Sequence, residues 1–247
     1  MLLALEIGNT TVAAALWADG AIAATWRGAT QDPDAPVALA AWVAAHEPPV
    51  ALVAASVVPA AAARWRGALG LREHWVGNDL DPPIERVYQP REALGSDRLL
   101  AALAARERWG APVLVADCGT ASTLDAVDAR GVFVGGAILC GLETMRDALA
   151  ARAAQLPPVP LAAPARALGT STVECLQVGL VRGHAGSLAA LADALRAELD
   201  APTAPLIGTG GLSLLLAEAA PGLFAALAPH LVLEGLALTY ERCVGEL

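Results

Sequence analysis

Leu2-Leu3-Ala4-Leu5-Glu6-Ile7-Gly8-Asn9-Thr10-Thr11 opens the chain as an apolar run of strand length that ends in an acid and a glycine turn. Residues 12–16 then return as a second strand. The same order recurs where Val113-Leu114-Val115-Ala116-Asp117 runs into Cys118-Gly119-Thr120-Ala121 and residues 122–127 return. Glu6 aligns with Asp117, Gly8 with Gly119, and Asn9 with Thr120. This repeat predicts two similar lobes, which we place at residues 1–110 and 111–247.

The rest of the chain alternates helix and strand patterns. A helix is predicted over residues 98–109, with Leu99, Leu100 and Leu103 on one face and Gly110 at its end. A long helical pattern over residues 172–199 is expected to break around Gly183 to Gly186. Further predicted elements are a helix over 35–46, a β-rich run over 50–58 that Pro59 stops, a surface connection over 156–164, a short strand at 206–207 and a helix over 213–220. This alternation is typical of an α/β protein with mixed sheets flanked by helices.

Composition excludes several classes of protein. Hydrophobic residues make up 56% of the chain, yet no apolar run reaches the ~18 to 20 residues that a membrane span needs. No basic stretch precedes the first apolar run, which argues against a secretory signal and for a cytoplasmic protein with no membrane partner. All 16 basic residues are arginine and the net charge is −9, so a lysine-containing P-loop is excluded and nucleic acid is not an expected partner. The four cysteines lack CxxC spacing, so we expect reduced, buried thiols.

The two glycine turns are candidate phosphate sites. Gly8 allows the backbone to come close to a ligand, and the amides and hydroxyls of Asn9, Thr10 and Thr11 could bind phosphate oxygens. Taken alone, this segment fits an ordinary hairpin turn better. The second turn is more telling, because an acid such as Asp117 at the end of a buried strand is costly unless it binds a cation or donors.

Two further glycine-rich segments and the histidines carry weaker signals. Gly208-Thr209-Gly210-Gly211, between a strand and a helix, could accept a ligand at the helix N-terminus or be a tight turn only. The segment from Gly135 to Gly141 could let backbone approach backbone or ligand. The four histidines are scattered and predict no metal site or catalytic triad, and His184 is expected at the surface.

Gly95-Ser96-Asp97-Arg98, preceded by Tyr88, lies at the start of a predicted helix. Asp97 could accept a proton from a substrate hydroxyl, as the general base of phosphoryl transfer does. Arg98 could hold a carboxylate through its planar guanidinium. A helix-capping Asp beside a solvated Arg explains the same spacing equally well.

In this order, the motifs resemble those of the type III pantothenate kinases over nearly the whole chain. Beyond the segments above, the resemblance includes Trp26-Arg27 with Thr30, Ser56-Val57-Val58-Pro59, Leu156-Pro157, Ser171-Thr172 and Leu233-Glu234-Gly235-Leu236. The resemblance implies duplicated actin-like (ribonuclease H-like) ATPase lobes. It also implies phosphorylation of the primary hydroxyl of pantothenate by ATP, the first step of coenzyme A synthesis. Such enzymes are typically homodimers that need Mg²⁺ and a monovalent cation, K⁺ or NH₄⁺.

The resemblance also implies roles for individual residues. Asp97 would be the catalytic base, and Asp117 would bind the monovalent cation. Pantothenate would be held by Tyr88, Gly95, Ser96, Arg98 and Thr172, the last reaching in from the dimer partner. ATP would be held by Glu6, Gly8, Asn9, Thr10, Thr11, Thr120, Gly210 and Gly211.

Two positions depart from the family pattern. Glu6 stands where the family usually has Asp, and an extra methylene moves the carboxylate by roughly an ångström, enough to cost on the order of 100-fold in rate. Cys140 stands in place of the usual proline, which affects the stiffness of the loop more than its chemistry. Glu6 leaves open a kinase-like regulatory factor that binds nucleotide without catalysis, although the intact Asp97 and Arg98 favour an active enzyme. A sugar or acetyl-group kinase of the same fold is disfavoured by the short chain and the GSDR tetrad.

Overall fold

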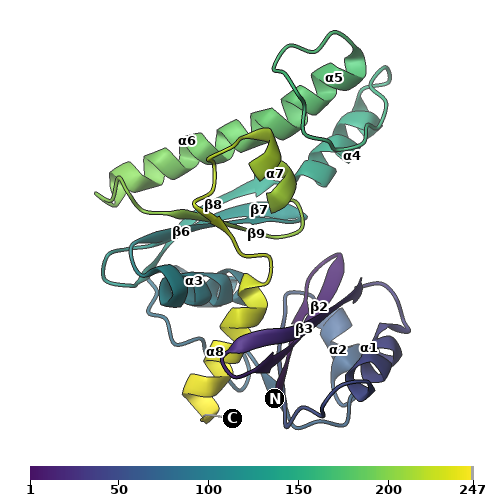
Figure 1. Cartoon of the computed structure of the whole chain (residues 1–247), viewed down its shortest axis with the longest axis vertical. Helices are drawn as coiled ribbons and strands as arrows, with labels where there is room; N and C mark the ends of the chain where they lie inside the picture. Colours follow the sequence, from purple (N-terminus) through teal and green to yellow (C-terminus); the bar gives the residue numbers. More distant parts are fainter. Residues whose placement is uncertain (246–247) are drawn as a thin grey trace. The chain divides into compact units, whose positions relative to one another are not determined.

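The computed structural model describes residues 1–245, which form two units (Figure 1). The first unit comprises Met1–Ala104 together with the C-terminal helix α8 (Leu231–Val244), and the second comprises Ala105–His230. The boundary falls within helix α3 (Ser96–Trp109). From the sequence, the C-terminal helix was predicted to belong to the second lobe. In the structure, the contacts of this helix group it with the first unit.

The first unit is built on a five-stranded sheet of order β3-β2-β1-β4-β5. Its strands are β1 (Leu2–Ile7), β2 (Thr11–Ala18), β3 (Ala21–Ala29), β4 (Leu52–Ser56) and β5 (Glu73–Trp75). β1 lies in the middle, antiparallel to β2 and parallel to β4. Apart from Glu6, every residue of β1 is buried, which explains why the strand is continuously apolar.

The helices of the first unit include α1 (Ala35–Ala44) and α2 (Pro59–Trp65), which has the predicted strand stop, Pro59, at its start. A 3₁₀ turn, Arg91–Ala93, precedes α3. Helix α8 contacts β1 and also packs closely on α3, because Gly235 has no side chain. A Cβ at Gly235 would lie 2.2 Å from the carbonyl oxygen of Leu100. The contacts of α8 with β1, β2 and β4 place the C-terminal helix in the first unit.

The second unit repeats the strand arrangement of the first, with a sheet of order β10-β9-β6-β7-β8. Its strands are β6 (Val113–Cys118), β7 (Ala121–Val127), β8 (Phe133–Cys140), β9 (Leu206–Thr209) and β10 (Ala226–Leu227). The central strand β6 is antiparallel to β7 and parallel to β9, as β1 is to β2 and β4. The repeat predicted from the two hairpins is confirmed.

The glycine-rich segment that begins at Gly135 is part of the edge strand β8. A Cβ at Gly136 would lie 1.9 Å from the carbonyl oxygen of Leu124 in β7, so the glycine permits close approach of backbone to backbone. Of the two alternatives left open for this segment, the structure shows this one.

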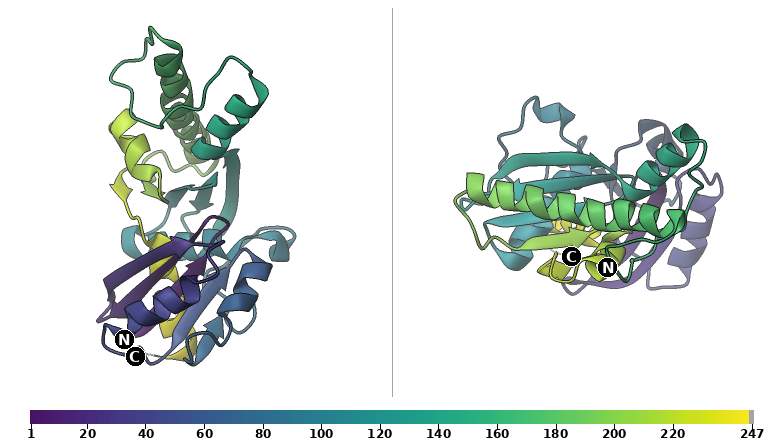
Figure 2. Two further views of the ribbon diagram at one scale, coloured as in Figure 1. Left: turned by 90° about the vertical axis from the view of Figure 1, so that its right-hand side faces the viewer. Right: turned by 90° about the horizontal axis from the view of Figure 1, so that it is seen from above.

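One long helical rod covers a face of the second sheet (Figure 2). It consists of α5 (Thr172–Gln177), a π-helical segment (Val178–Arg182) and α6 (Gly183–Glu198), and its Leu188 and Ala192 pack into the core with Leu124. The predicted break around Gly183–Gly186 is wrong, because the irregular turn comes just before it and the helix continues. The other helices of this unit are α4 (Leu142–Arg152) and α7 (Ser213–Ala219).

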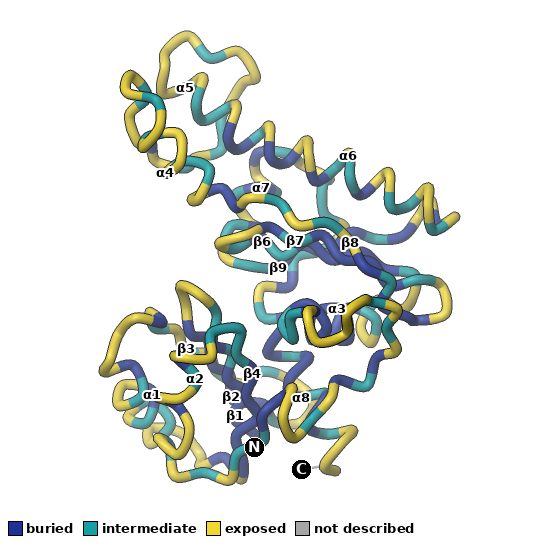
Figure 3. Tube along the Cα trace, turned by 180° about the vertical axis from the view of Figure 1, so that it is seen from behind, coloured by how far each residue is buried: buried dark blue, intermediate teal, exposed yellow. Residues whose placement is uncertain are grey.

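The central strands β1, β4 and β6 are largely buried, as are residues 99–105 of α3, whereas the edge strand β3 has no buried residue (Figure 3). The expectation of buried thiols holds only for Cys118, since Cys140, Cys175 and Cys243 are exposed, free cysteines. Within residues 1–245, no helix has the length and apolar character that crossing a membrane requires.

Candidate active site

A small pocket lies at the carboxyl ends of β1 and β4 in the first unit. Parallel pairing brings these two strand ends to the same edge of the sheet, where the first turn of α3 also arrives. The lining residues are Glu6, Ile7, Ala55, Ser56, Val57, Ser96 and Asp97. The structure thus brings the first-loop acid together with two residues of the GSDR tetrad.

The carboxylate of Asp97 is held by its immediate neighbours. The backbone N–H of Arg98 donates to Oδ1 of Asp97 at 2.8 Å. Gly95 leaves the room for this carboxylate, because a Cβ there would lie 2.4 Å from Oδ1. Burial raises the pKa of Asp97 above its ordinary value of 3.8, outweighing the Arg98 N–H and the Arg98 charge, which both lower it. A more basic carboxylate is a better proton acceptor.

Arg98 and Tyr88, both predicted to contact substrate, lie side by side in the first unit. The Arg98 guanidinium carbon is 5.5 Å from the centroid of the Tyr88 ring, within the range of a cation–π contact. Only 8% of Arg98 is exposed, so the alternative of a solvated arginine at the helix start is not what the structure shows.

The first glycine turn presents polar groups at the end of the central strand. Gly8 donates its N–H to the Thr11 carbonyl at 3.0 Å, closing the turn. Asn9, Thr10 and Thr11 are exposed, as residues that meet a ligand must be. The turn is one residue longer than its counterpart, since four residues separate the paired Ile7 and Val12, whereas three separate Cys118 and Ser122.

The second glycine turn packs closely against the TGG segment, Thr209-Gly210-Gly211. Gly210 adopts a φ of +82°, and a Cβ there would lie 2.4 Å from Oδ1 of Asp117 and 2.6 Å from the backbone nitrogen of Cys118. Ser213 donates its hydroxyl to the Gly210 carbonyl at 2.8 Å. Two predicted ligand-binding segments of the second unit therefore meet at Asp117.

Burial, and then the neighbouring Asp117 charge, raise the pKa of the Cys118 thiol to about 12. This thiol is therefore protonated and unreactive at neutral pH.

His184 is a polar residue of the second unit that sequence reasoning misplaced. It is 3% exposed, and its Nε2 lies 2.8 Å from the hydroxyl of Ser122, the first residue after the second turn. Burial lowers its pKa, so the ring is neutral at neutral pH. The expectation of a surface residue is wrong. The helical spacing of His184, Leu188 and Ala192, all on the buried face of α6, was the signal that could have found it.

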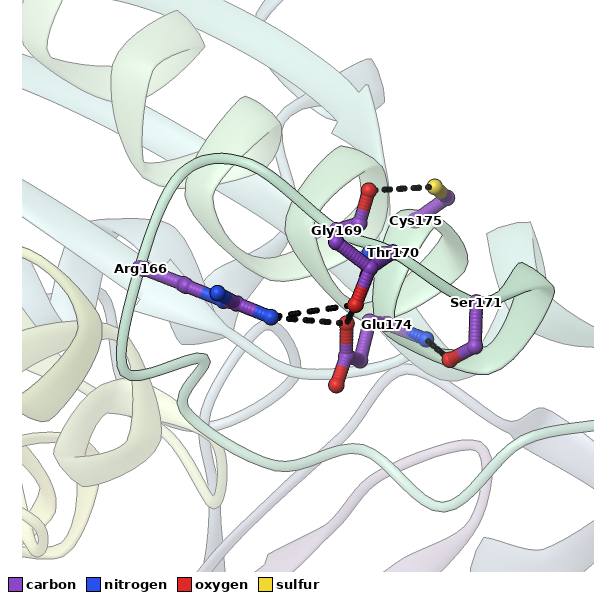
Figure 4. A network of polar contacts seen from close by, with 6 residues as sticks. All are labelled: Arg166, Gly169, Thr170, Ser171, Glu174 and Cys175. Carbon is purple, nitrogen blue, oxygen red and sulfur yellow. Dashed lines mark hydrogen bonds and ion pairs between the residues drawn. The ribbon is translucent and has the colours of Figure 1, made fainter.

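Thr172 is the first residue of α5, and a polar network orders the segment before it (Figure 4). Ser171 caps the helix by accepting from the Glu174 N–H at 3.2 Å, and Glu174 accepts from the Thr170 N–H at 2.7 Å. Arg166 donates to the Thr170 hydroxyl at 3.0 Å. This reciprocal capping fixes the backbone that carries the exposed Thr172.

Among residues 1–245, no three His, Cys, Asp or Glu side chains form a group that could hold a metal ion.

Comparison with solved structures identifies the class of fold. A candidate 2-dehydro-3-deoxygalactonokinase from Sinorhizobium meliloti superposes with a TM-score of 0.60 at 15% identity, covering 98% of this chain and 97% of that one. The inorganic polyphosphate/ATP-glucomannokinase of an Arthrobacter strain gives a TM-score of 0.51 at 16% identity and covers 96% of each chain. With their mixed sheets flanked by helices, the two units have the duplicated actin-like fold of sugar kinases and related ATPases.

Sequence relatives narrow the class to one family. The family model described as type III pantothenate kinase matches residues 2–194. The type III pantothenate kinase of Thermomicrobium roseum is 40% identical over 257 residues, covering 98% of this chain and 97% of that protein. That of Rubrobacter xylanophilus is 37% identical, covering 97% of each. This chain belongs to the type III pantothenate kinase family, so it is an enzyme of the kinase class.

Gly210→Ala is expected to destabilise the chain more than Gly222→Ala does. Both glycines have a positive φ, +82° and +86°, so alanine meets left-handed strain of ~1 to 2 kcal/mol at either site. Only at Gly210 would the new Cβ also meet Asp117 and Cys118, and such overpacking costs roughly 1 to 3 kcal/mol more. Chemical denaturation of the two variants measures the difference. Equal losses would contradict the close packing of the TGG segment on the second turn.

Proposed function

We propose that the chain transfers the γ-phosphoryl group of ATP to the primary hydroxyl of pantothenate, giving 4'-phosphopantothenate in the first step of coenzyme A synthesis. One observation carries the proposal. In a member of this family, Asp97 lines the pocket at the end of the central strand, and burial raises its pKa. These are the properties of a general base that accepts the proton of a substrate hydroxyl.

Residues around Asp97 supply the pantothenate site in this proposal. Arg98 is nearly buried against Tyr88, and its planar guanidinium suits the pantothenate carboxylate. Ser96 lines the pocket, and Gly95 leaves space for the base. With their positions fixed by α3, these groups orient the hydroxyl toward Asp97, which takes up its proton as the phosphoryl group is transferred.

ATP is assigned to the two glycine turns. The exposed donors of Asn9, Thr10 and Thr11 suit phosphate oxygens, and Gly8, which has no side chain, lets the turn come close to them. Thr120, Gly210 and Gly211 provide similar groups in the second unit. Mg²⁺, which accompanies ATP, prefers carboxylate oxygens, and Glu6, which lines the pocket, would be its partner. When bound, the ion neutralises phosphate charge.

Asp117 is assigned to a monovalent cation, K⁺ or NH₄⁺. It lies at the end of the second central strand, against the backbone of Cys118 and Gly210. A carboxylate among main-chain groups is a suitable partner for a weakly bound cation. The assignment rests on the family resemblance of this segment.

A nucleotide-binding factor without catalysis is the rival function. Glu6 is the feature that raised it, because the family usually has Asp there. The family assignment and the environment of Asp97 favour an active enzyme.

Asp97→Asn is expected to lower pantothenate-dependent ADP release by ~10²- to 10⁴-fold without unfolding the chain. A coupled ADP-release assay with pantothenate, with and without K⁺, measures this and tests the proposed function itself. No pantothenate-dependent ADP release by the wild type would favour the rival function. A folded Asp97→Asn chain that keeps most of its kcat would exclude Asp97 as the base.

The raised pKa of Asp97 gives the same variant a second, pH-dependent readout. Above this raised pKa the ionised carboxylate costs stability, and the cost disappears as the pH falls toward the ordinary value of 3.8. The Asp97→Asn chain should therefore be at least as stable as the wild type at pH 7. Any excess in its free energy of unfolding over that of the wild type should decrease as the pH is lowered. The acidic limb of the wild-type kcat/KM profile should lie above 3.8.

Glu6→Asp is expected to give equal or higher activity, because it restores the acid usual in the family. Glu6→Gln should weaken the response to Mg²⁺, since one anionic partner is lost, while the KM for pantothenate stays near that of the wild type in both variants. A Mg²⁺ titration of kcat compares the three proteins. If Glu6→Gln follows the wild-type curve throughout, Glu6 has no part in binding the metal.

We propose further that the protein is a cytoplasmic homodimer, in which Thr172 of the partner subunit completes the pantothenate site. Large apolar side chains are exposed on the second unit near this threonine in sequence: Leu168 is 73% and Val173 42% exposed. A second copy of the chain would cover them. Sedimentation velocity at assay concentration should show a dimer, and a fully active monomer would contradict the proposal.

A further inference from the structure

Thr30 lies directly after β3 and binds the first glycine turn at two points. Its hydroxyl donates to the Gly8 carbonyl at 2.7 Å, and its backbone N–H donates to the Thr10 carbonyl at 2.9 Å. Only 1% of this polar residue is exposed. In the proposed function so far, Thr30 has no role, although it contacts the turn assigned to ATP.

These two bonds also fix the direction of two N–H groups of the turn, which point away from the carbonyls that Thr30 binds. A peptide unit is planar and trans, so the direction of a carbonyl fixes that of the N–H that follows it. When Thr30 holds the Gly8 carbonyl, it therefore orients the Asn9 N–H. Likewise, the bond to the Thr10 carbonyl orients the Thr11 N–H. Both amides belong to the turn that would bind phosphate.

Thr30 is itself held from a third direction. The guanidinium of Arg64, in α2, donates to the Thr30 carbonyl. Hydrogen bonds therefore connect α2 to Thr30, and Thr30 to the turn at the end of β1. The donor to the Gly8 carbonyl is the Thr30 hydroxyl, which a substitution can remove without changing the backbone.

The second unit also has a threonine whose hydroxyl binds its glycine turn, although this residue lies four positions after the end of the third strand rather than directly after it. Thr144, in the first turn of α4 after the third strand β8, donates its hydroxyl to the Thr120 carbonyl at 2.9 Å. Gly141 allows this approach, because a Cβ there would lie 2.3 Å from the Thr120 carbonyl oxygen. By the same planarity, Thr144 orients the Ala121 N–H. Each turn is held by a threonine that follows the third strand of its unit.

We propose that Thr30 and Thr144 are positioning residues for ATP: their hydroxyls fix the backbone of the two glycine turns so that the amides are oriented for phosphate before the nucleotide arrives. The inference rests on the proposed function, since it assigns ATP to these turns. If the inference is right, loss of either hydroxyl weakens the binding of ATP but not that of pantothenate. A purely structural role would not predict this selectivity.

The test compares Thr30→Val, which removes the hydroxyl at nearly constant shape, with Thr30→Ser, which keeps it. Thr30→Val should raise the KM for ATP about 5- to 10-fold, as expected for one lost hydrogen bond, and leave the KM for pantothenate unchanged. Thr30→Ser should return the KM for ATP to within about 2-fold of the wild type. Thr144→Val and Thr144→Ser should behave in the same way. Thr25→Val, at an exposed site on β3, is the matched control and should alter neither constant.

Two results would overturn the inference. One is an unchanged KM for ATP in both valine variants. The other is an equal rise in both KM values with a lower melting temperature, which a loosened fold would produce.

Calorimetric titration of the same variants with ATP needs no turnover and separates this inference from the proposed function. Wild type that binds ATP but releases no ADP would reject the proposed function, and the affinity ratio of valine to serine variants would still decide the inference. Wild type without affinity for ATP would reject both.

Discussion

The parallel pairing of each central strand with a later strand is the constraint on which the sites depend. β1 pairs with β4 so that Glu6 lies opposite Ala55, and β6 pairs with β9 so that Asp117 lies opposite Thr209. A slip of one residue in either pairing would bring a different residue to the position of the acid and turn its side chain to the other face of the sheet. The apolar strand therefore fixes where its single acid emerges. Because parallel strands end at the same edge, that acid meets the loops that follow both strands.

Asp97 differs from two surface acids, Asp128 and Asp147, in the direction of its pKa shift. At Asp128, desolvation raises the pKa, but hydrogen bonds from Val132 and Arg130 together outweigh it, so the pKa is lowered. At Asp147, the hydrogen bond from Arg146 outweighs desolvation and lowers the pKa. For Asp97 the balance is reversed, since burial outweighs the Arg98 N–H and charge and raises the pKa. A partly desolvated carboxylate lowers the stability of the folded chain. Such a loss of stability is expected at a site of proton transfer, but not where an ion pair only holds a loop.

Local patterns predicted the elements on which the site is built. The repeated strand, acid and glycine turn, the helix ending before Gly110 and the TGG turn each depend on neighbouring residues, and each appears in the structure. Long-range packing was not predictable in this way. The grouping of α8 with the first unit depends on its contacts with β1, β2 and β4, which lie far from it in the sequence. His184 was misplaced because its glycine-rich flanks suggested a surface loop. The threonines that hold the turns lie more than 20 residues from them along the chain, so no local pattern could have revealed their contacts.

The duplication preserves the arrangement of the strands but gives the two acids different surroundings. In the second unit, Gly210 comes so close to the Asp117 carboxylate that even one added methyl would collide with it. At the corresponding edge of the first unit, β4 ends at Ser56, and Glu6 lines a small pocket together with Ser56, Val57 and Asp97. Asp117 therefore occupies space that a glycine backbone leaves open, whereas Glu6 lies beside another acid of the pocket, Asp97. The shorter acid, Asp117, suits a tightly packed position, and the longer acid, Glu6, lines a pocket with Asp97. The same arrangement of strands therefore supports two different roles for a carboxylate at the same position.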